Sequence, residues 1–129
     1  MKVLVLSNCE LQEKEIGTEL EDLQEIVGGY IEIPYLGDVF VNNGIDVIIN
    51  EEGKLIEGLR AEIAIVNKQR GAILDIVYGN CIFASHNDEG ETIGLTDEQI
   101  QIVTKELETV FEMMDKETEE IFDIRALFI

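Results

Sequence analysis

The chain has 129 residues, 46% of them hydrophobic, and its 28 Asp and Glu against 9 Lys and Arg give a formal net charge of −19. This hydrophobic content predicts a folded core and excludes a disordered acidic tail. The charge disfavours direct binding to nucleic acid or to an anionic membrane. The length predicts a single domain over residues 1–129.

The N-terminal segment predicts a strand and a cytoplasmic protein. Residues Lys2 to Ser7 form an apolar, β-branched run that is typical of a first strand. This run is too short for a signal peptide or a membrane span. The cysteines, Cys9 and Cys81, form neither a disulfide framework nor a metal-binding pair. We therefore expect a soluble, cytoplasmic protein with reduced thiols.

A helix is predicted after a polar loop. Thr18 and Glu21 have the spacing of a capping box, and Leu20, Leu23, Ile26 and Val27 recur at helical intervals. Gly28 and Gly29 then supply a left-handed stop.

The middle of the chain predicts short strands. These are residues 30–34, residues 39–41, and a hairpin in which residues 46–50 and 54–55 flank a turn with Gly53 at positive φ. Asn50, Glu51 and Glu52 also suggest a Ca²⁺ loop, but the alternating ligands and bidentate Glu of an EF-hand are missing, so no metal is expected. Residues 57–67 fit either a helix or a strand. Residues 73–85 read as strand with a break at Gly79-Asn80.

The C-terminal part predicts a long amphipathic helix. Thr96 and Gln99 form a second capping box, and an apolar stripe recurs every three or four residues as far as Met114. Acidic residues continue beyond it, and the chain ends in an apolar cluster. That cluster consists of Ile121, Phe122, Ile124, Leu127, Phe128 and Ile129. This cluster has three interpretations: it docks on the sheet, it forms a homodimer contact, or it anchors a partner.

Several segments taken together resemble the domain of unknown function 3846 family. They are Val27-Gly28-Gly29-Tyr30-Ile31-Glu32, Asn50-Glu51-Glu52-Gly53-Lys54-Leu55 with Gly58-Leu59, and Leu95-Thr96-Asp97-Glu98-Gln99. The resemblance divides the domain into a core over residues 1–112 and a helical extension over residues 113–129. It implies a small protein encoded by phages, plasmids or their bacterial hosts, and it supplies no activity.

The expected fold is α+β, with a small, mostly antiparallel sheet packed against two main helices and an acidic C-terminal helical segment. Nineteen charges equal those of about 32 Å of B-DNA, which is close to the diameter of a domain of this size. This favours a DNA mimic that blocks the basic surface of a host nuclease or DNA-binding protein, and the implied mobile-element origin points to counter-defence. The expected acidic face comprises Glu108, Glu112, Glu117, Glu119, Glu120 and Asp123.

Two other readings remain open. One is a structural interaction module, and the other is a binder of a nucleotide signal with a pocket near Tyr30, Arg60, Lys68 and Arg70. Catalysis is not expected, because His86 is the only histidine and no nucleophile, metal or P-loop motif is present. No cofactor is expected either.

Overall fold

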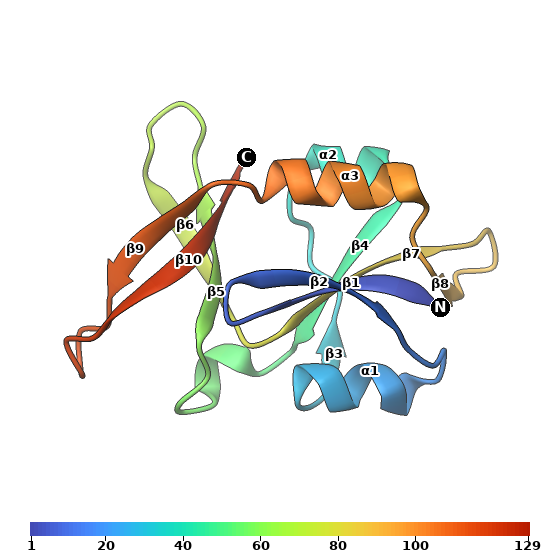
Figure 1. The fold of residues 1–129 in the computed structure, drawn as a ribbon, viewed down its shortest axis with the longest axis horizontal. Helices are drawn as coiled ribbons and strands as arrows, with labels where there is room; N and C mark the ends of the chain where they lie inside the picture. Colours follow the sequence, from blue (N-terminus) through green and yellow to red (C-terminus); the bar gives the residue numbers. More distant parts are fainter.

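The computed structural model describes residues 1–129 and confirms the α+β class (Figure 1). The strands form two sheets, and all pairs are antiparallel except β10 with β5. Sheet 1 has the order β2-β1-β7-β4-β3, with β8 beside β7, and sheet 2 has the order β6-β5-β10-β9. The strands of sheet 1 are β1 (Lys2–Ser7), β2 (Glu10–Glu15), β3 (Ile31–Glu32), β4 (Ile45–Asn50), β7 (Cys81–His86) and β8 (Thr92–Ile93). Those of sheet 2 are β5 (Ala61–Val66), β6 (Ile73–Tyr78), β9 (Val110–Met114) and β10 (Ile121–Phe128).

Helices cover both faces of sheet 1. The helices are α1 (Leu20–Val27), α2 (Asp38–Asn42) and α3 (Asp97–Glu106), with a short 3-10 helix, η1 (Gly53–Leu55). In Figure 1, α2 and α3 lie above sheet 1 and α1 lies below it. Alternate residues of the strands therefore face two apolar layers. None of the three α-helices has the length and apolar composition that crossing a membrane requires.

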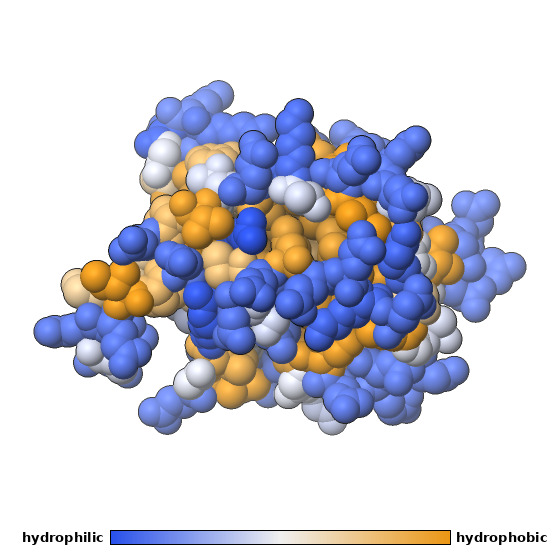
Figure 2. Space-filling view, in the orientation of Figure 1, coloured by the Kyte–Doolittle hydropathy of each residue, from blue (hydrophilic) through white to orange (hydrophobic).

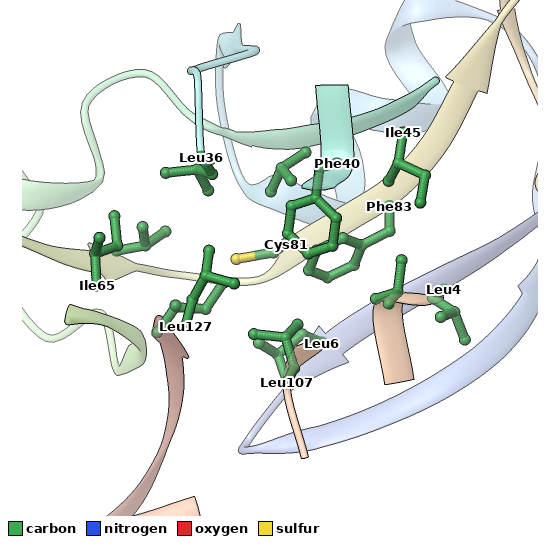
Figure 3. Packing of buried hydrophobic residues seen from close by; sticks show 14 of the residues in the cluster. Leu4, Leu6, Leu36, Phe40, Ile45, Ile65, Cys81, Phe83, Leu107 and Leu127 are labelled. Carbon is green, nitrogen blue, oxygen red and sulfur yellow. The ribbon is translucent and has the colours of Figure 1, made fainter. Parts of the chain in front are cut away.

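The larger core lies on the α3 side and joins the two sheets. Phe83 of β7 packs edge-on against Phe40 of α2, with ring centroids 5.9 Å apart. Leu107, just after α3, and Leu127 of β10 are buried in the same cluster (Figure 3). Sheet 2 is thus held to sheet 1 by shared apolar contacts as well as by the connecting chain.

Both main helices begin and end at local signals. Thr96 caps α3 and exchanges hydrogen bonds with Gln99, as predicted. The first helix is capped one residue later than expected. Glu19, and not Thr18, is its N-cap, and the backbone amide of Glu19 donates a hydrogen bond to the carboxylate of Asp22. Gly28 ends α1 at φ 84°, the left-handed conformation that glycine adopts without strain.

Four local predictions were wrong. Residues 39–41 lie in α2, and residues 53–55 form η1 in place of a hairpin strand. Gly53 has no positive φ; an added Cβ would lie 2.7 Å from the carbonyl oxygen of Tyr78, so glycine is required there by close approach. The supposed polar loop contains β2, an edge strand whose charged residues discourage further pairing. By contrast, the predicted break at Gly79-Asn80 is confirmed, and there the chain passes from β6 of sheet 2 to β7 of sheet 1.

The largest correction concerns the C-terminal segment. α3 ends at Glu106, and residues 110–128 form the hairpin of β9 and β10. The predicted helical extension over residues 113–129 is therefore wrong. β10 lies between β5 and β9 inside sheet 2, and its residues Ile124, Ala126 and Leu127 are buried. The expectation that the apolar C-terminal cluster docks on a sheet is confirmed for these residues, whereas Ile121 stays 66% exposed.

Candidate functional site

The hairpin of β9 and β10 carries the expected acidic residues, and it projects from the body of the protein (Figure 1). Glu108 lies before β9, and Glu117, Glu119 and Glu120 lie in the turn. Glu112 and Asp123 lie on the strands, and all six residues are exposed. In Figure 2, the hairpin at the left has apolar side chains along its strands and hydrophilic ones at its tip.

Two of these carboxylates are cross-strand partners. Glu112 of β9 is directly opposite Asp123 of β10, so both side chains project from the same side of the hairpin. Like charges in this position destabilise a sheet. The five ion pairs of the protein involve neither residue, nor any of the other four. None of these ion pairs therefore offsets the repulsion between Glu112 and Asp123.

The nearby basic residues are directed elsewhere. Arg125 donates from Nε to the carbonyl oxygen of Cys9 and from Nη1 to that of Leu107, both at 2.9 Å. Its guanidinium is consequently held at the base of the hairpin. Lys116 is exposed in the turn. Over residues 108–125, seven acidic and two basic residues leave a net charge of −5.

Exposed apolar side chains accompany the two carboxylates. Val110 and Met114 alternate with Glu112 on β9, and Ile121 alternates with Asp123 on β10. These three side chains are 44%, 59% and 66% exposed. This side of the hairpin thus offers both negative charge and apolar area to a partner.

A buried carboxylate anchors sheet 2 to the tip of the β1–β2 hairpin. Glu62, 1% exposed, accepts hydrogen bonds from the backbone amides of Asn8 (2.9 Å) and Cys9 (2.8 Å). Arg60 Nη1 donates to the same carboxylate at 2.9 Å. Asn8 and Cys9 both have positive φ, as a two-residue type I′ turn requires, so their amides point outward together.

A β-bulge aims Glu62 at this turn. The pairing of β5 with β6 shifts between Ala61 and Ile63, which leaves Glu62 as the additional residue. The anchoring role of Glu62 was not predicted from the sequence. The signal for it was a single charged residue within the apolar run Ala61 to Val66. Burial, with a smaller contribution from the Glu62 carboxylate, raises the pKa of the Cys81 thiol well above its usual range. Cys81 is therefore a protonated core residue at neutral pH.

The four residues expected to form a nucleotide pocket are not brought together. Arg60 and Lys68 flank opposite ends of β5, which places them roughly 26 Å apart along an extended strand. Arg60 is engaged by Glu62 and by the carbonyl oxygen of Asp123 (2.5 Å), and it stacks over the ring of Phe122. Arg70 is exposed in the turn between β5 and β6. Tyr30, 70% exposed, precedes β3 in sheet 1.

A cleft of about 360 Å³ lies between the β3–β4 end of sheet 1 and β6. Its acidic lining residues are Glu32, Glu51, Glu52 and Asp75, and its one basic residue, Lys54, is paired with Asp75. This pairing lowers the pKa of Asp75 below its ordinary value. An acidic lining disfavours a phosphate group. Asn50 is occupied by the carbonyl oxygen of Val27 and the amide of Glu52 and so has a structural role.

The structure contains no group of three His, Cys, Asp or Glu residues arranged to hold a metal ion. In comparisons with known proteins, no curated protein and no solved structure matches the chain. The family model described as Domain of unknown function (DUF3846) matches residues 1–108. The matched region includes both main helices and all of sheet 1 but ends before β9. The chain therefore belongs to the domain of unknown function 3846 family, and its acidic hairpin lies beyond the part that the family model describes.

Proposed function

We propose that this protein is a non-enzymatic binding protein whose acidic hairpin occupies the basic DNA-binding surface of another protein. The observation that carries the proposal is the set of exposed carboxylates on β9, β10 and their turn, none of which has an ion-pair partner in the fold. Binding to a basic surface would relieve the repulsion between Glu112 and Asp123.

The charge density of the hairpin supports this reading. From Glu108 to Lys116 the chain covers roughly 27 Å of extended backbone. One strand of B-DNA carries about eight phosphates over that length. The hairpin carries seven acidic residues between positions 108 and 123, which is nearly the same number. The target would be a host nuclease or DNA-binding protein, and blocking it would serve counter-defence by a phage or plasmid.

The anchoring of the hairpin also supports a binding role. Arg60 and Arg125 hold β10 in place. Arg60 donates to the carbonyl oxygen of Asp123 and stacks over Phe122, and Arg125 donates to the carbonyl oxygens of Cys9 and Leu107. A preorganised hairpin loses less conformational freedom on binding than a flexible acidic tail would.

The test compares two variants that lose the same charge. The hairpin variant is Glu112→Gln with Asp123→Asn, and the control is Glu21→Gln with Glu25→Gln on the exposed surface of α1. Each protein is immobilised and incubated with bacterial lysate at 50 mM NaCl, and retained proteins are eluted with a DNA duplex. For each eluted DNA-binding protein, displacement of a fluorescent duplex is then measured at several salt concentrations.

We expect the wild type and the control to displace the duplex, with the same salt dependence. The hairpin variant should displace it more weakly, with a log–log salt slope flattened by about two units, one for each lost contact. Equal weakening of the control would mean that net charge alone acts. Failure of the duplex to elute any retained protein would refute the proposal.

A further inference from the structure

The face of sheet 2 that points away from sheet 1 is apolar, and no element outside sheet 2 contributes to its hydrophobic cluster. The inward residues of this sheet, such as Ile63 and Leu127, join the core shared with sheet 1. The alternate residues form a separate cluster in which every member comes from sheet 2 itself. This outer face comprises Ala64, Val66, Ile73, Ile76, Tyr78, Phe111, Met113, Phe122, Ile124, Ala126 and Phe128.

The large side chains of the outer face retain solvent exposure. Ile73 is 46% exposed and Phe128 is 39% exposed. Ile76, Phe111 and Phe122 are partly buried and pack against Ala64, Ile124 and Ala126, which are at most 1% exposed. A continuous apolar sheet face of this kind marks an interaction surface.

Opposite charges stand at the two ends of this face. β10 runs parallel to β5, so the turn before β10 and the turn after β5 lie at opposite ends of sheet 2 (Figure 1). The turn before β10, residues 115–120, contains four acidic residues and one lysine. The turn after β5, residues 67–72, contains Lys68 and Arg70 and no acidic residue. Two of only nine basic residues in the chain are therefore concentrated in one short turn.

Both turns are ordered, and their charges are unpaired within the chain. Asn67 Oδ1 accepts hydrogen bonds from the amides of residues 69 and 70, and Asp115 Oδ1 accepts from those of residues 117 and 118. No ion pair involves either turn. The turns are separated by the length of β10, roughly 26 Å, which is several Debye lengths at physiological ionic strength. They cannot neutralise each other within one molecule.

We propose that the outer face of sheet 2 is a homodimer interface with two-fold symmetry. A two-fold contact requires a self-complementary surface, in which each end of the face meets the opposite end of its mate. A positive turn, an apolar centre and a negative turn satisfy this requirement. With the two sheets face to face and antiparallel, Lys68 and Arg70 of each copy meet Glu117, Glu119 and Glu120 of the other.

The size of the face suits a dimer. Four strands at about 4.8 Å spacing and a strand of about 26 Å give a projected area of roughly 500 Å². The two turns extend it toward the ~800 Å² per partner that is typical of specific interfaces. The dimer goes beyond the proposed DNA mimicry. It leaves Glu112 and Asp123 free, because they project from the opposite side to Phe111 and Phe122, but it shares the turn carboxylates Glu117, Glu119 and Glu120 with the mimicry.

The experiment exchanges charges between the two turns. The basic-turn variant is Lys68→Glu with Arg70→Glu, and the acidic-turn variant is Glu117→Lys with Glu119→Lys and Glu120→Lys. The mass of the full chain in solution is measured by light scattering and native mass spectrometry at 100 mM NaCl. A third variant, Ile73→Glu, places a charge at the exposed edge of the apolar face, and circular dichroism checks that each variant is folded.

We expect the wild type to be a dimer and each charge variant to dissociate about tenfold more readily, because like charges then meet at both ends. Mixing the two charge variants should restore a heterodimer, because the two reversed turns then attract each other at one end and the two unchanged turns attract each other at the other end. Ile73→Glu should be monomeric. A monomeric wild type, or a dimer that all three variants leave unchanged, would overturn the proposal.

Discussion

Replacing Glu62 with Gln should destabilise the protein strongly, although one oxygen and the shape of the side chain are kept. The carboxylate accepts two backbone amides and the Arg60 guanidinium while 1% exposed. A carboxamide can accept only on its oxygen, and its amino group would face another donor. One amide of the β1–β2 turn would be left unsatisfied, and the Arg60 charge would lose its partner.

The magnitude follows from these contacts. A stranded buried donor costs about 1–3 kcal/mol, and breaking a buried ion pair costs about 3–5 kcal/mol. Arg60 keeps 28% side-chain exposure and its bond to Asp123, which reduces the second cost. We therefore expect a loss of about 3 kcal/mol in the free energy of unfolding. For a domain of this size, that loss lowers Tm by about 10 °C.

Urea unfolding and calorimetry would measure this loss. The matched control is Glu25→Gln on α1, where the side chain is exposed, and it should change stability by less than about 0.5 kcal/mol. A double variant, Arg60→Gln with Glu62→Gln, should cost less than the sum of the two single changes because both partners are removed together. A Glu62→Gln protein as stable as the control would refute the reasoning, because the carboxylate would then be solvated in solution.

Two further predictions test other parts of the fold. Deletion of residues 121–129 removes β10 from the interior of sheet 2, where Ile124 and Leu127 each contribute roughly 1.5–3 kcal/mol of burial free energy. The deletion should therefore abolish cooperative unfolding of sheet 2, and an unchanged urea midpoint would contradict this. Asp75→Asn should reduce stability slightly at pH 7, because the lowered pKa of Asp75 makes its pairing with Lys54 stabilising above the ordinary carboxyl pKa. The stabilisation from the Asp75–Lys54 pair is lost as the pH falls through the lower folded-state pKa of Asp75. The urea midpoints of the wild type and Asp75→Asn should therefore converge toward pH 2. A difference in midpoint that does not change with pH would contradict the prediction.

The local sequence determined the features that depend on near neighbours. The capping box of Thr96 and Gln99 and the glycine stop at Gly28 identified where α3 begins and where α1 ends. The apolar run after Lys2 identified β1. The expected exposure of the six acidic residues also held, because charged side chains without partners stay in water.

Only the tertiary structure decided the fold of residues 110–128. Val110 and Met114 fit a strand as well as they extended the helical stripe, and the choice depended on β10, which itself requires β5 far earlier in the chain. The same dependence on distant partners hid the role of Glu62, whose bonds to Asn8 and Cys9 cross more than fifty residues. β2 pairs locally with β1, and its charged composition made it resemble a loop. Strand pairing is set by contacts remote in sequence, whereas caps and stops are set within one helical turn. The acidic residues were therefore identified from the sequence, but their placement on a hairpin, opposite an apolar sheet face, came from the packing of the whole chain.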